Sequence, residues 1–245
     1  MTDPYRTLGT GYAEQRRPDP RLAAIIDDAL GDARTVVNVG AGTGSYEPVD
    51  RAVLAVEPSP VMIAQRRPGS ASVVRAVAER LPFADGSFDA GLAVLTVHHW
   101  TDPARGLAEL RRVSRRQVVV TWDPAVMSRF WLVADYLPEI ADAERGLATC
   151  EFISRELAPA RVTALPVPHD CTDGFLAAYW NRPHAYLDPA VRASISSLAK
   201  LDPVRVDEAM RRLRADLDSG AWQERHGSPD ATGTADVGYR LVSTP

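Results

Sequence analysis

The sequence predicts an α/β fold with a doubly wound, mostly parallel sheet of seven strands. Short β-branched runs such as residues 35–39 alternate with helical stretches throughout the first half of the chain. The connections between them are short, which implies right-handed crossovers and a parallel sheet. A glycine-rich turn directly follows the first β-branched run, as is typical of a buried strand that leads into a ligand-binding loop.

The other elements of the first half follow in order along the chain. Ser59 is a good N-cap and Pro60 a good first residue for a helix that ends near residue 66. Asp102 and Pro103 begin a second helix in the same way. Apolar runs predict the remaining strands of this half, over residues 52–56, 72–75, 88–97 and 117–122.

After residue 122 the regular alternation stops. We expect helices over residues 124–138 and 151–158, a strand over 161–167 and a last strand within 237–243. The segments 123–160 and 172–217 are predicted to be helical insertions that form a cap. Residues 220–236 are polar and rich in turn formers, so they are predicted to be a surface loop.

Length and composition are those of an ordinary globular protein. The 245 residues are 45% hydrophobic and 24% charged, which excludes a collagen-like or wholly disordered chain. We expect one domain over residues 1–245, with residues 1–122 as its ligand-binding half. The net charge of −4 provides little basic surface, so no nucleic-acid partner is expected.

Membrane and secretion signals are not expected either. No apolar run approaches the roughly 20 residues of a membrane span, and residues 1–19 are too polar for a signal peptide. Cys150 and Cys171 have no spacing that suggests a zinc site or a disulfide framework, so a reducing, cytoplasmic location is expected. The arginine clusters, among them residues 16–17 and 66–67, are predicted to lie mostly on solvated surfaces.

The strongest functional signal is the pattern Gly40-x-Gly42-x-Gly44 at the end of the first strand. Glycines at these positions allow a tight turn and let a ligand approach the backbone closely. Glu57 ends the next strand, thirteen positions after Gly44, where a carboxylate can accept both hydroxyls of a ribose. Together they predict an adenosine-bearing cofactor at the carboxyl edge of the first two strands.

The spacing of the glycines helps to choose the cofactor. A dinucleotide fingerprint is G-x-G-x-x-G, with a helix directed at a pyrophosphate. Here the spacing is shorter, and Glu47 follows closely, where its charge would repel a pyrophosphate. A zwitterionic ligand with a sulfonium group would meet no such repulsion.

These residues resemble the class I S-adenosylmethionine-dependent methyltransferases, most closely the ubiquinone/menaquinone-biosynthesis type. Segments 39–44, 78–83 and 95–103 match in order, and residues 12–18 are similar to a helix that closes over the cofactor. The resemblance implies a Rossmann-like fold, S-adenosyl-L-methionine as cofactor and methyl transfer to a small-molecule acceptor. It is weak beyond residue 122, and Asn38 and Val77 stand where the family often has acids. The residues that it implies at the cofactor are Tyr12, Gly40, Ala41, Gly42, Gly44, Glu57, Pro58, Ala78, Glu79 and Leu95.

His98 and His99 follow the fourth predicted strand, at the edge where ligands of such sheets bind. Methyl transfer from a sulfonium is an in-line displacement, for which the protein mainly aligns the reactants and excludes water. A base helps when the acceptor must lose a proton, and histidine has a suitable pKa. Both histidines are therefore candidate catalytic residues, with loop packing as the alternative. With no cysteine or paired carboxylate nearby, they make a weak metal site, and no metal is expected.

Two other functions stay open at this point. A nicotinamide-dependent oxidoreductase shares the sheet and the ribose-binding acid, although it needs the longer glycine spacing. A non-catalytic S-adenosylmethionine-binding protein would share every feature of the cofactor half. The sequence specifies neither the methyl acceptor nor the oligomeric state.

Overall fold

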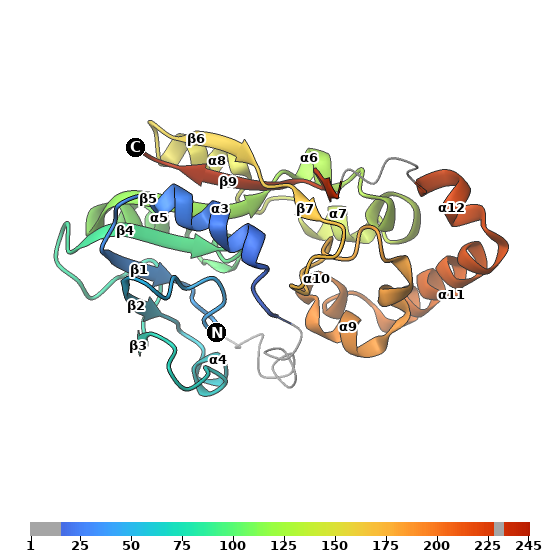
Figure 1. Ribbon diagram of the computed structural model, residues 1–245, viewed down its shortest axis with the longest axis horizontal. Coiled ribbons are helices and arrows are strands. Elements are labelled where there is room, and N and C mark those ends of the chain that lie inside the picture. The colour runs from blue at the N-terminus through green and yellow to red at the C-terminus, as the bar shows by residue number, and fades with distance from the viewer. Residues whose placement is uncertain (1–15, 228–232) are drawn as a thin grey trace.

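The computed structural model describes residues 16–227 and 233–245, which form one seven-stranded sheet with helices on both faces (Figure 1). The strand order is β3-β2-β1-β4-β5-β9-β6. All neighbours are parallel except β9, which is antiparallel to both β5 and β6. The predicted seven-stranded, mostly parallel sheet is thus confirmed. Its strands are β1 (Thr35–Val39), β2 (Ala52–Val56), β3 (Ser72–Val74), β4 (Phe88–Val94), β5 (Ser114–Trp122), β6 (Arg161–Ala164) and β9 (Tyr239–Ser243).

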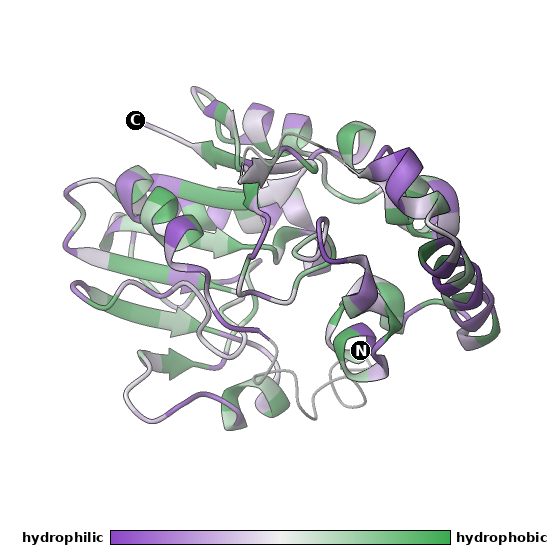
Figure 2. Ribbon diagram, turned by 45° about the vertical axis from the view of Figure 1, so that its right-hand side comes forward, coloured by the Kyte–Doolittle hydropathy of each residue, from purple (hydrophilic) through white to green (hydrophobic). Residues whose placement is uncertain are grey.

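The central strands are buried on both faces, so their sequences are mostly apolar. Alternate residues of one strand reach different cores: Val118 and Val120 belong to one apolar cluster and Val119 to the other. The strands accordingly appear mostly green in the hydropathy view (Figure 2). Burial of both faces is what a parallel sheet between two helical layers requires.

Helices cover the two faces separately. On one face lies α3 (Pro20–Leu30), which buries Leu22, Ile26 and Leu30 against β5 and its neighbours. On the other face lies α5 (Pro103–Val113), which begins at its N-cap Asp102. Next to it packs α8 (Cys150–Glu156), in contact with α5, β6 and β9. Since α8 covers the sheet, the C-terminal part of the predicted insertion 123–160 does not belong to the cap.

The helix expected to begin at residue 60 is α4 (Pro60–Ala64), which follows β2. Apart from α4 and a short 3₁₀ turn after β4, the remaining helices gather beyond the carboxyl ends of the strands, to the right of the sheet in Figure 1. Their predicted position over this edge agrees with the structure. This region also contains a short two-stranded antiparallel ribbon, formed by β7 (Val167–Pro168) and β8 (Thr234–Ala235). The helices of this cap are α6 (Pro124–Met127), the π turn η2 (Leu132–Tyr136), α7 (Glu139–Ala143), the 3₁₀ helix η3 (Pro183–Leu187), α9 (Pro189–Ser194), α10 (Ser196–Ala199), α11 (Pro203–Ser219) and α12 (Ala221–His226).

Several predicted elements differ in the structure. The strand expected over residues 88–97 ends at Val94, and the strand expected over 161–167 is divided into β6 and β7. The helix expected over residues 124–138 is broken into α6 and η2, where the amide of Leu137 donates to the carbonyl of Leu132 in a π turn. The loop expected over 220–236 contains α12. Gly220 ends α11 in a left-handed conformation (φ +81°) and begins α12 at once, and Trp222 anchors this short helix in the core. A single buried anchor in a polar segment gives too little periodicity for a sequence-based helix prediction.

Within residues 16–227 and 233–245, no helix combines the length and the apolar character needed to cross a membrane.

Candidate active site

The glycine loop leaves β1 in a tight turn that exposes its backbone. The amides of Gly40 and Ala41 both donate to the carbonyl of Val56, at 2.9 and 3.0 Å. Gly40 has φ +71°, and a Cβ there would lie 1.9 Å from Oγ1 of Thr96. Glycine at this position therefore lets the end of β4 pack directly on the loop.

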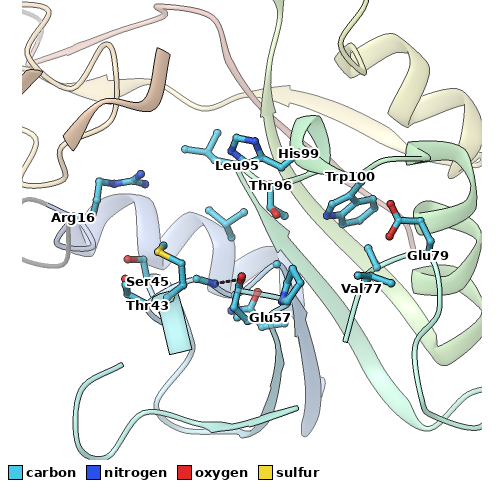
Figure 3. Close-up of a pocket in the computed structure, with 18 of the residues that line it drawn as sticks. Arg16, Thr43, Ser45, Glu57, Val77, Glu79, Leu95, Thr96, His99 and Trp100 are labelled. Carbon is cyan, nitrogen blue, oxygen red and sulfur yellow. Dashed lines mark hydrogen bonds between the residues drawn. The ribbon is translucent and has the colours of Figure 1, made fainter. Parts of the chain in front are cut away.

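Glu57 ties the end of β2 to this loop. Its Oε2 accepts a hydrogen bond from the amide of Gly42 at 2.8 Å, and its Oε1 accepts one from the amide of Ser59 at 2.9 Å. The side chain is only 5% exposed, yet it lines the cavity above the loop (Figure 3). A carboxylate at this place offers the kind of acceptor that a ligand's hydroxyls need.

A cavity at the carboxyl ends of β1, β2 and β4, here called the cofactor pocket, unites most of the predicted cofactor residues. Thr43, Ser45 and Glu57 lie on one side of it, and Val77, Glu79 and Trp100 lie on the opposite side (Figure 3). Oε1 of Glu79 accepts hydrogen bonds from the amides of Thr101 and Asp102 and so fixes the loop before α5. The predicted residues that line this pocket are Gly40, Ala41, Gly42, Glu57, Pro58, Ala78, Glu79 and Leu95.

Two predicted cofactor residues stand apart from this pocket. Tyr12 lies outside the described residues. Gly44 faces away from the cavity, because a Cβ there would meet Glu47 and Arg66 at 3.1 and 3.2 Å. Asn38 and Val77, the departures from the family pattern, both line the pocket.

The structure corrects the role that the sequence suggested for Glu47. Its carboxylate accepts hydrogen bonds from Nη2 of Arg66 at 2.7 and 2.8 Å, and both side chains are less than 10% exposed. Nδ2 of Asn38 donates to the same carboxylate. Glu47 thus stabilises the underside of the loop and presents no charge to a ligand. Arg66, predicted on a solvated surface, is buried in this ion pair.

Arg16 is the second arginine whose predicted place was wrong. Its guanidinium pairs with Asp173, with Nε 2.7 Å from Oδ1, and its side chain is 12% exposed. Oδ2 of the same carboxylate accepts from the hydroxyl of Tyr46 at 2.9 Å. Burial, and next the charge of Asp173, raise the pKa of Tyr46 well above its usual value, so this hydroxyl stays protonated as a donor.

A second cavity, here called the acceptor pocket, lies between the end of β4 and the cap. It meets the cofactor pocket at Arg16, Leu95 and His99, which line both. Leu95 has φ +50°, an uncommon conformation for a residue with a side chain, at this boundary. The walls of the acceptor pocket are mainly apolar and aromatic. They include Trp122, Met127, Ile140, Leu147, Phe175, Leu176, Ile195 and Tyr239.

The polar groups of the acceptor pocket lie close together. His98 and His99 belong to the 3₁₀ helix η1 (Val97–His99), with ring centroids 3.8 Å apart, and His98 packs edge-on against Trp122. Burial is the main cause that lowers the pKa of His99 to about 4 and that of His98 well below its usual value. Nε1 of Trp122 donates to Glu144 at 2.9 Å, and burial raises the pKa of this carboxyl to about 7. Because of their lowered pKa values, the rings of His98 and His99 are neutral at pH 7.

The cofactor pocket fits S-adenosylmethionine in its donor and acceptor set. The glycine loop provides close backbone approach, Glu57 provides acceptors for ribose hydroxyls, and Ala78 with Trp100 provides apolar surface for an adenine. The fold and this site are those of the class I S-adenosylmethionine-dependent methyltransferases, and the chain belongs to that family. S-adenosylmethionine is the cofactor of this family and accordingly of this chain.

Comparisons with known proteins support this assignment. Residues 37–120 match the family model described as a methyltransferase domain. The crystal structure of a methyltransferase candidate from an antibiotic biosynthesis pathway of Anabaena variabilis is 31% identical, with 94% of this chain and 99% of that chain covered and a TM-score of 0.87. An uncharacterized methyltransferase of Mycobacterium bovis is 42% identical over 111 residues, which are 43% of this chain and 45% of that protein. A chloroplastic 2-methyl-6-phytyl-1,4-hydroquinone methyltransferase of rice is 31% identical over 144 residues, 52% of this chain and 41% of that protein. The chain thus spans less than half the length of these curated relatives.

Sequence reasoning missed two polar side chains of the acceptor pocket, Glu144 and Lys200, and it placed Arg16 at the cofactor only through the resemblance of segment 12–18. Arg16 and Asp173 are 157 positions apart, and no local pattern connects them. Lys200 is the only lysine of the sequence, and no motif surrounds it. Among the residues that the structure describes, no group of three or more His, Cys, Asp or Glu side chains could hold a metal ion.

Proposed function

We propose that this chain transfers the methyl group of S-adenosylmethionine to a small molecule bound in the acceptor pocket. The observation that carries the proposal is the shared wall of the two pockets at Arg16, Leu95 and His99. A methyl donor in one pocket and an acceptor in the other would meet at this wall. The cofactor, when bound, supplies an activated methyl group on its sulfonium.

The cofactor would be held by the residues that line its pocket. Glu57 accepts hydrogen bonds from the ribose, the backbone of residues 40–42 approaches the methionine part, and Ala78 and Glu79 flank the adenine. Arg16 is the one permanently cationic side chain among the described residues of this lining, and it suits the carboxylate of the methionine part. Trp100 closes the pocket against water on the side of α5.

His98 and His99 are proposed to orient the acceptor and to take up its proton where one must be lost. Their lowered pKa values keep both rings unprotonated at pH 7, which is the state in which a proton acceptor must start. His99 is placed at the boundary of the two pockets, whereas His98 lines the acceptor pocket alone. The cap excludes water, which favours the alignment of acceptor and methyl group.

The walls of the acceptor pocket favour a small acceptor with an apolar body. The lining is aromatic and aliphatic, and cap helices lie over it. Such a pocket suits a small molecule and not a nucleic-acid duplex or a folded protein. The rice relatives act on a phytyl hydroquinone. Membership of the quinone-methylating branch stays a prediction for this chain, and so do the acceptor's identity and the atom that receives the methyl group.

The test is methyl transfer from labelled S-adenosylmethionine to a metabolite library, followed by kinetics on the acceptor that is found. We expect His98→Ala to lower turnover about 100-fold or more, because the proton acceptor is lost. The affinity for S-adenosylhomocysteine, measured by calorimetry, should stay nearly unchanged in this variant. Full activity of His98→Ala would show that the ring only packs the loop, and a wild-type chain that labels no acceptor would contradict the proposed activity.

A further inference from the structure

We propose that Asp173, a residue of the cap, is a positioning residue of the cofactor site. It fixes the loop that follows the glycine motif through Tyr46, and it holds the guanidinium of Arg16 at the boundary between the two pockets. The inference rests on the proposed function for the use of the site, but its readout is cofactor affinity alone. Cofactor binding and the ordering of the cap are thereby coupled.

The Asp173 carboxylate is fully buried and uses both oxygens. Oδ2 accepts from the hydroxyl of Tyr46 at 2.9 Å, and Oδ1 accepts from Nε of Arg16 and from the amide of Gly174, each at 2.7 Å. The exposed fraction of the side chain is 0%. A buried carboxylate is tolerated only with partners of this kind, so the three donors and the carboxylate keep one another in place.

Tyr46 shows what this contact does for the cofactor loop. Its backbone has φ +62°, in the left-handed region that residues with side chains avoid. The hydroxyl is held twice, since it donates to Asp173 and accepts from the amide of Asp19 at 3.3 Å. Without these bonds the backbone of Tyr46 would relax towards the right-handed region. Its neighbours Gly42, Thr43 and Ser45, which line the cofactor pocket, would then move with it.

The same carboxylate sets the position of Arg16. This side chain lines both pockets and comes from the segment that leads into α3, far in sequence from Asp173. A second buried carboxylate, that of Asp19, receives the amide of Thr172 from the cap at 3.0 Å. Three segments distant in sequence, around residues 16–19, 46 and 170–174, are therefore joined directly beside the glycine loop. Figure 3 shows Arg16 across the cavity from Leu95 and His99.

The test compares the affinity for S-adenosylhomocysteine, by isothermal titration calorimetry, in Tyr46→Phe, Asp173→Asn and the double variant. We expect each single substitution to raise the Kd about tenfold, because only a fraction of the molecules then has the competent loop. The Kd of the double variant should be only slightly higher than the higher Kd of the two single variants, since both substitutions break the same contact.

Tyr186→Phe is the matched control. The hydroxyl of Tyr186 is also fully buried and donates to a backbone carbonyl, that of Leu176, but within the cap. This variant should lose thermal stability while it keeps the wild-type Kd. An unchanged Kd in Tyr46→Phe, with a loss of stability like that of the control, would overturn the proposal even if Asp173→Asn fails to fold. A wild-type chain without affinity for S-adenosylhomocysteine would overturn both this inference and the proposed function.

Discussion

His99 stays neutral in the folded chain because its ring is enclosed between the two pockets, and this has a consequence for stability. Its pKa is about 4 when folded and about 6.5 when unfolded. As the pH falls from 6.5 to 4, the unfolded chain binds a proton that the folded chain rejects, so the free energy of unfolding decreases. The contribution is fully present above pH 6.5.

We therefore predict that His99→Gln changes this pH dependence. The quantity of interest is the free energy of unfolding of the variant minus that of the wild type. It should rise by about 2 kcal/mol as the pH is lowered from 7 to 4.5, because the variant lacks the group that destabilises the wild type at low pH. Urea unfolding at both pH values measures it. The opposite effect of Glu144, whose raised pKa favours the folded chain at low pH, is present in both proteins and cancels in the difference. A difference that does not vary with pH would show that the ring titrates normally.

At the residue scale, the predictability of the site depends on sequence distance. Gly40, Gly42 and Glu57 lie beside the strand ends that position them, so the spacing alone predicted the turn and the strand end at which the structure has them, whereas Gly44 turns away from the pocket. Arg16 and Arg66 belong to arginine clusters that were expected mostly on solvated surfaces. Each is instead largely buried in an ion pair with a carboxylate to which no local sequence pattern links it. Charge runs indicate solvated surfaces only as long as no buried partner is available.

At the scale of elements, α5 supports the cofactor pocket through one close contact. Gly106 lies under the ring of Trp100, and a Cβ there would be 2.3 Å from Cε3 of the indole. The ring forms part of the pocket wall. The absence of a side chain at Gly106 is thus what allows the helix to approach the loop that precedes it.

Gly106→Ala should push the indole towards the cofactor pocket. We expect a loss of about 1–3 kcal/mol in stability from overpacking, together with weaker binding of S-adenosylhomocysteine. Ala108→Gly, at an exposed position of the same helix, is the control: it should cost about 1 kcal/mol of stability and leave the affinity unchanged. Chemical unfolding and calorimetry on both variants separate the two effects. Wild-type affinity in Gly106→Ala would mean that the ring moves away from the pocket.

The elements themselves were predictable where local signals were strong. The strands over residues 35–39 and 52–56 have the predicted bounds, since both are short β-branched runs that end in loop signals. The cap was less predictable. Its helices are short, and their ends depend on contacts such as the hydrogen bond from Nε1 of Trp131 to the carbonyl of Trp180, which only the folded chain brings together.

At the scale of the whole molecule, cofactor binding should stabilise the folded chain. A ligand that binds only the folded state at 100 times its Kd adds about 2.7 kcal/mol, which for a chain of this size raises the Tm by roughly 5–10 °C. S-adenosylhomocysteine should produce this shift, and NAD should produce none. In Glu57→Ala the affinity should fall by about 1–3 kcal/mol, because the ribose loses its charged acceptor, and the shift should shrink accordingly. A larger shift with NAD than with S-adenosylhomocysteine would contradict the cofactor assignment.

The antiparallel strand β9 also has a bearing on how the chain folds. It lies between β5 and β6, and β6 is joined to the sheet only through it. Residues 161–164 must therefore wait for residues 239–243, about 75 positions later, before they can pair. The strands from β3 to β5 all lie within residues 35–122, so their connections are much shorter and they can assemble earlier. Closure of this long loop is slow for entropic reasons, so the sheet should be completed late, after its cofactor-binding half has already condensed.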